Sequence, residues 1–100
     1  MRVVLSDGTA ELVDASDCKG FHVEVIGDVD VAAVLDESGA GRLADDGEHA
    51  LVDIGWVRQH ATGTGPDWNQ EFDGMLDYAR TKGWIDEGAS AIVAHLEHPE

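Results

Sequence analysis

Three residues that could do chemistry stand at alternate positions near the middle of the chain: Trp56, Arg58 and His60. On a strand, alternate side chains point to the same face, so these three would form one small surface. Arginine holds anions, histidine exchanges protons near neutral pH, and tryptophan offers a flat apolar wall. Together with His22 from an earlier strand, we expect them to bind a small anionic molecule or a peptide in a cleft.

The same residues define a catalytic alternative. His60 or His22 would act as the general base, and Arg58 would orient an anionic substrate. Glu24 or Asp53 would hold the imidazole ring. This small enzyme requires a concave pocket that contains at least two of these residues, and finding His22 and His60 on opposite surfaces would exclude it in this form.

The common motifs for cofactors and metals are broken or missing. Gly39 to Ala44 has the G-x-G-x-x-A spacing of a dinucleotide-binding loop, but Asp45 and Asp46 follow where a helix should carry the pyrophosphate. The five histidines are His22, His49, His60, His95 and His98, and no two of them have the i, i+4 spacing of a helical metal site. We therefore expect no cofactor and no metal, unless ligands from distant parts of the chain come together.

The charge of the chain restricts its partners. Its 100 residues include 21 acidic and 6 basic ones, a net charge of -15. A surface this negative repels nucleic acids and anionic membranes, so direct binding to either is not expected. Because the acids are dispersed, we interpret them first as the solvated surface of a folded domain. A decoy that occupies a nucleic-acid-binding protein is a further hypothesis, and the oligomeric state stays open.

The single cysteine, Cys18, indicates a location for the protein. One cysteine forms no intramolecular disulfide, which is typical of a reducing compartment. The apolar runs are far shorter than the roughly 20 residues that span a bilayer. We expect a cytoplasmic protein that folds as one globular domain over residues 1–100.

The first half of the chain predicts strands around one turn and a short helix. Residues 2–6 and 9–13 flank Asp7-Gly8, a dipeptide that favours a hairpin turn. Residues 21–25 alternate between apolar and polar types, which indicates a half-buried strand. Asp28 would cap a helix over 28–38, although a strand fits these residues too, and 39–48 reads as a loop.

The second half predicts a strand, a long helix and a final strand. Residues 50–57 alternate, with Gly55 as a possible bulge. Apolar residues then recur at helical spacing over about 67–82: Trp68, Phe72, Met75, Leu76 and Ala79. Residues 89–97 read as the last strand.

These elements predict an α+β fold. It would have a small, mainly antiparallel sheet of about five strands, with the long helix and the short helix packed on it. Without a strong catalytic motif, we interpret the protein as a non-enzymatic binding or accessory module. It would act on a protein partner or a small ligand through a sheet edge or the loop before the long helix.

Overall fold

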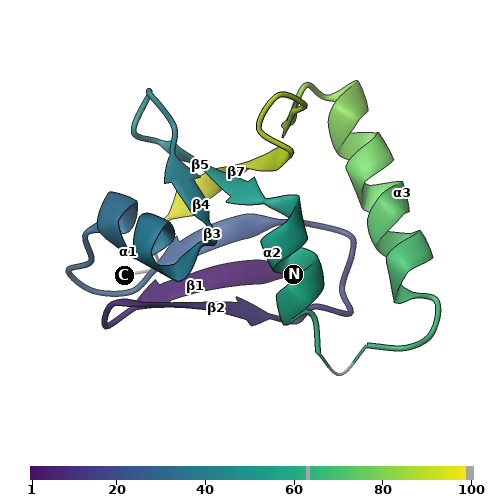
Figure 1. Cartoon of the computed structure of the whole chain (residues 1–100), viewed down its shortest axis with the longest axis horizontal. Helices are drawn as coiled ribbons and strands as arrows, with labels where there is room; N and C mark the ends of the chain where they lie inside the picture. The colour runs from purple at the N-terminus through teal and green to yellow at the C-terminus, as the bar shows by residue number, and fades with distance from the viewer. Residues whose placement is uncertain (63, 99–100) are drawn as a thin grey trace.

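The computed structural model describes residues 1–62 and 64–98, which form a sheet curled into a half-barrel around two helices, with a third helix at one end (Figure 1). Gly63, within the loop before the long helix, lies outside the described residues. The described part holds seven strands and three helices. In chain order they are β1 (Arg2–Ser6), β2 (Thr9–Val13), β3 (His22–Val25), α1 (Val31–Ser38), β4 (Gly41–Leu43), β5 (His49–Asp53), α2 (Ile54–His60), α3 (Trp68–Thr81), β6 (Ile85–Asp86) and β7 (Ala91–Glu97).

The predicted sheet is wrong in both strand number and direction. The strand order is β2-β1-β3-β7-β5-β4, and β6 pairs with β7 beside this path. Strand β3 runs parallel to β1 and to β7, while the other pairings are antiparallel. The fold is therefore a mixed sheet with three helices, not a mainly antiparallel sheet of five strands with one long helix. Alternation along a strand carries no information about its neighbours, so the sequence pattern missed the parallel pairs.

The first hairpin forms as predicted. Ser6 pairs with Thr9, and the two residues between them have positive φ, 48° at Asp7 and 79° at Gly8. Two central residues of positive φ are the signature of the type I′ turn, whose twist matches that of the strands.

The short helix forms within the predicted range but starts later. Asp30, not Asp28, caps it, and the Asp30 side chain accepts a hydrogen bond from the backbone N–H of Ala33 at 3.2 Å. The helix ends at Gly39, whose φ of 75° suits a residue without a side chain. The strand alternative for residues 28–38 is thus wrong.

The predicted strand over 50–57 stops at Asp53. The Asp53 side chain accepts a hydrogen bond from the backbone N–H of Gly55 at 2.9 Å and caps α2. Gly55 therefore belongs to the first turn of a helix and is not a bulge. Trp56, Arg58 and His60 lie on this helix, so their alternation does not place them on one face.

Two short strands were not foreseen, β6 and β4. Strand β4 lies inside the predicted loop of 39–48 and pairs with β5. Its first residue, Gly41, has a φ of 155°, and a Cβ there would stand 1.9 Å from the carbonyl oxygen of Leu51. Only glycine allows the two backbones to approach this closely. Gly41 indicates a loop in the sequence, but the pairing of β4 with β5 requires it.

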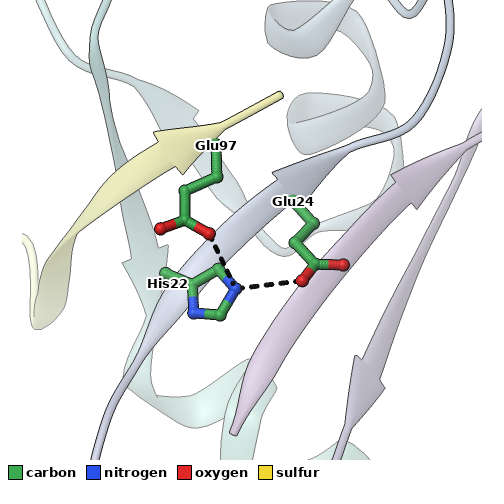
Figure 2. Close-up of side chains that lie close together, drawn as sticks. All are labelled: His22, Glu24 and Glu97. Carbon is green, nitrogen blue, oxygen red and sulfur yellow. Dashed lines mark hydrogen bonds and ion pairs between the residues drawn. The ribbon is translucent and has the colours of Figure 1, made fainter. Parts of the chain in front are cut away.

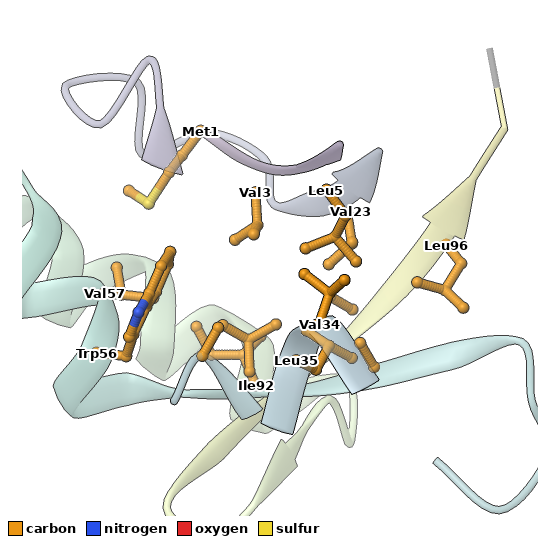
Figure 3. Close-up of a cluster of buried hydrophobic side chains, with 14 of the residues drawn as sticks. Met1, Val3, Leu5, Val23, Val34, Leu35, Trp56, Val57, Ile92 and Leu96 are labelled. Carbon is orange, nitrogen blue, oxygen red and sulfur yellow. The ribbon is translucent and has the colours of Figure 1, made fainter. Parts of the chain in front are cut away.

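One face of the sheet is covered and makes the core. Side chains from β1, β3, β5 and β7 meet α1 and α2 there, and Figure 3 shows many of them. The buried set includes Val3, Leu5, Val23, Val52, Ile92 and Leu96 from the sheet with Val34, Leu35, Trp56 and Val57 from the helices. Helix α3 adds Trp68, Phe72 and Leu76 at the end of this core.

The opposite face, which we call the open face, carries Arg2, His22, Glu24, His95 and Glu97. These side chains are half-buried or exposed, in contrast to the buried residues that alternate with them. No helix in the described ranges has the length and apolar character needed to cross a membrane.

Candidate functional site

Trp56 and His60 lie one turn apart on α2 and contact each other. Their rings stack with centroids 4.3 Å apart, and Nδ1 of His60 donates a hydrogen bond to the Trp56 carbonyl oxygen at 2.8 Å. Trp56 is buried in the core. This pair stabilises the end of the helix and does not line a shared cleft with Arg58.

Arg58 points toward α3. Its guanidinium donates to Oδ1 of Asn69 at 2.9 Å and to Oδ1 of Asp73 at 2.6 Å, and it lies over the Phe72 ring at 4.9 Å. These contacts connect α2 to α3 and use two of the five N–H donors of Arg58. That Arg58 binds an anion therefore stays a prediction, with part of its guanidinium already occupied by Asn69 and Asp73.

His22 is separated from the other three predicted residues. It lies on β3 on the open face, whereas α2 packs against the covered face through Trp56 and Val57. His22 and His60 are therefore on opposite sides of the sheet. The form of the acid–base hypothesis that places both histidines in one pocket therefore does not fit this fold.

A different cluster assembles around His22. Its Nε2 atom lies 3.2 Å from Oε1 of Glu24 and 3.3 Å from Oε2 of Glu97 (Figure 2). One ligand atom from each residue lies within 4.8 Å of the other two. The cause is the register of the sheet: His22 and Glu24 share a face of β3, and Glu24 pairs with Glu97 on the parallel strand β7.

The cluster has an excess of negative charge. Arg2 pairs in register with His22, and its Nε lies 3.4 Å from the same Glu24 oxygen. A second nitrogen of Arg2 forms an ion pair with Asp14. The hydrogen bond to Asp14 raises the pKa of Arg2, which keeps it charged. Counted without His22, the group holds one guanidinium, that of Arg2, and three carboxylates, those of Asp14, Glu24 and Glu97, for a net charge of -2.

The burial of the cluster makes this excess matter. The side chains of Glu24 and His22 are 23% and 31% exposed, so water screens them only in part. Nε2 of His22 carries at most one hydrogen, which can point squarely at only one of the two facing oxygens. A bound cation would satisfy both carboxylates at once.

Two further histidines lie beside this cluster on the open face. His49 on β5 pairs with His95 on β7, and their rings meet edge to face with centroids 6.0 Å apart. His95 precedes Leu96, and Leu96 pairs with Val23, the residue after His22. The register thus places the three histidines in one row across β3, β7 and β5.

The sequence pattern missed Glu97 and with it the cluster. His22 and Glu24 were recognisable as a polar pair on one strand face. Glu97 lies at the other end of the chain, and only the parallel pairing of β3 with β7 brings it close. The expectation of no metal site allowed for ligands from distant parts of the chain, and these three residues are such a set.

The buried core of the described residues is apolar throughout. None of the buried residues that the structure describes is polar or charged, so the groups that could do chemistry lie at the surface.

Three kinds of comparison were made with known proteins. No family model, no curated protein and no solved structure matches the chain.

Proposed function

We propose that the protein is a non-enzymatic binding module whose ligand is a divalent transition-metal ion, held by His22, Glu24 and Glu97. The observation that carries the proposal is that one imidazole nitrogen and two carboxylate oxygens lie within 4.8 Å of one another. Zn²⁺ binds such atoms at about 2.0–2.2 Å, which places tetrahedral ligands about 3.4 Å apart. The Nε2–oxygen separations of 3.2 and 3.3 Å are close to that spacing.

The ligand set favours one class of cation. Imidazole and carboxylate together suit Zn²⁺ and its neighbours, whereas Ca²⁺ takes six to eight oxygen ligands. His22, Glu24 and Glu97 supply three ligands from neighbouring strands. A fourth position stays open to water or to a group of a partner.

A binding role fits the rest of the molecule better than a catalytic one. The cluster lies on an exposed sheet face, with Glu97 48% exposed, and a reaction there would not be protected from water. A cytoplasmic location belongs to the proposal, supported by the single free thiol of Cys18.

Titration calorimetry with Zn²⁺ tests the proposal. The wild-type chain should bind one ion, and Glu97→Gln or His22→Gln should weaken binding by about tenfold or more, because each removes one of three ligands. Glu11→Gln is the matched control, since it removes the same charge from an exposed position on the neighbouring part of the sheet.

Two outcomes would contradict the proposal. One is equal weakening by Glu97→Gln and Glu11→Gln, which would mean diffuse attraction of cations to an acidic surface. The other is no binding by the wild-type chain at neutral pH. Ca²⁺ in a parallel titration should bind far more weakly than Zn²⁺.

A further inference from the structure

We propose that Arg2 is a built-in counter-ion of the metal site and sets its affinity, an inference that rests on the proposed function. The guanidinium stands beside the ligands without being one of them. Its Nε is 3.4 Å from Oε1 of Glu24, the same oxygen that faces His22. A metal ion and Arg2 therefore compete for the negative charge of one carboxylate.

The contact between Arg2 and Glu24 is incomplete. The Nε atom is shielded from solvent and has no hydrogen-bond acceptor among the described residues, although Glu24 is near. A shielded donor without an acceptor carries a desolvation cost, so the Arg2–Glu24 contact is an ion pair that no hydrogen bond from Nε completes. Arg2 contributes charge to the site without closing it.

Asp14 holds the other end of the guanidinium. It forms an ion pair with a terminal nitrogen of Arg2 and follows directly after β2, at the edge of the sheet. When a cation takes the Glu24 oxygen, repulsion pushes Arg2 away, and Asp14 is the carboxylate that keeps it. Asp14 is thus a positioning residue that lowers the cost of displacing Arg2 from Glu24.

Two variants separate these roles. Arg2→Met keeps a long apolar side chain and removes the charge, so Zn²⁺ should bind about tenfold more tightly at low salt. Asp14→Asn leaves Arg2 with Glu24 as its nearest carboxylate, so Zn²⁺ should bind several-fold more weakly. The gain from Arg2→Met should shrink at about 0.3 M NaCl, because salt screens exposed charges.

Arg42→Met is the matched control. It removes the same charge from an exposed residue of β4, which is the strand at the opposite edge of the sheet from β2 and β1. Calorimetry should give the wild-type affinity for this variant. Circular dichroism and the melting temperature establish that each variant is folded, and Arg2→Gln replaces Arg2→Met if the latter is not.

The outcomes keep the two proposals apart. If wild type binds Zn²⁺ and the neutral Arg2 variant binds it with unchanged affinity, or if Arg42→Met gives an equal gain, the role of Arg2 is wrong while the site stands. If neither wild type nor the neutral Arg2 variant binds Zn²⁺, the proposed function itself is wrong. Opposite shifts for the Arg2 and Asp14 variants support the inference.

Discussion

The two faces of the sheet use the same strands for different purposes. On β3, Val23 and Val25 are 0% and 3% exposed and point into the core, while His22 and Glu24, which alternate with them, point to the open face. Four consecutive residues thus contribute both to packing and to the candidate metal site. Because successive side chains of a strand point to opposite faces, one residue can pack in the core while its neighbour carries a candidate metal ligand.

The faces also differ in the kind of interaction that holds them. The covered face gains from apolar area removed from water, which is large and insensitive to salt. The open face is held by partly exposed ion pairs, which typically contribute about 0–1 kcal/mol each. Substitutions on the two faces should therefore have very different effects on stability.

The sharpest test of this contrast is one pair of neighbouring residues on β1. Leu5 is fully buried, and Val4, beside it, faces the opposite way and is half-buried. Leu5→Ala should lower the free energy of unfolding by about 2–5 kcal/mol through lost burial and a cavity. Val4→Ala should cost about 1 kcal/mol or less. Urea unfolding followed by tryptophan fluorescence measures both.

Equal losses for Leu5→Ala and Val4→Ala would break the distinction between the faces. Such a result would mean that the open face is covered by another molecule in solution, for example a second copy of the chain. If Leu5→Ala no longer folds, Val3→Ala replaces it in the measurement. Val3→Ala is a smaller deletion in the same core and should still lower the free energy of unfolding by more than Val4→Ala does.

A second prediction concerns the open face alone. Glu97→Gln should change the free energy of unfolding by less than about 1 kcal/mol while it weakens Zn²⁺ binding by about tenfold or more. The small change should be stabilising at low salt, since the substitution relieves repulsion within a cluster of net charge -2. Urea unfolding without metal, at low salt and at about 0.5 M NaCl, tests the sign. A loss comparable to that of Leu5→Ala would mean that Glu97 is a structural residue.

Local signals in the sequence predicted local structure well. Asp7-Gly8 placed the hairpin, and the helical stripe from Trp68 to Ala79 lies within α3 as observed. Sheet order was not available from such signals. Strand β7 lies between β3 and β5 although it comes last in the chain, and no pattern within 91–97 encodes those neighbours.

The candidate site divides in the same way. His22 lies on the polar face of β3, as its alternation indicated, whereas Trp56, Arg58 and His60 lie on α2 and not on a strand. Apolar residues at 50, 52, 54 and 56 fit a strand, and Asp53 ends that strand because its side chain caps a helix. Trp56 and His60 then stand one helical turn apart, where alternation has no meaning.

The smallest predicted effect concerns the rim of the open face, where Asp46 supports His49. The Asp46 carboxylate accepts hydrogen bonds from the backbone N–H of Glu48 at 2.8 Å and from Nδ1 of His49 at 2.7 Å. The bond from Glu48, followed by that from His49, lowers the pKa of Asp46 below its ordinary value.

This lowered pKa makes the Asp46 carboxylate contribute to the stability of the fold above the ordinary aspartate pKa of about 3.9. The contribution is lost as the pH falls through the lowered value. Asp46→Asn should therefore reduce the melting temperature by about 2 °C at neutral pH, and this gap should begin to shrink below about pH 4 and close as the pH falls through the lowered pKa. Asp45→Asn, at the neighbouring exposed position, should leave the melting temperature unchanged. A gap for Asp46→Asn that stays constant down to acid pH would show that the carboxylate charge does not support the turn, and that shape alone holds His49 on this face.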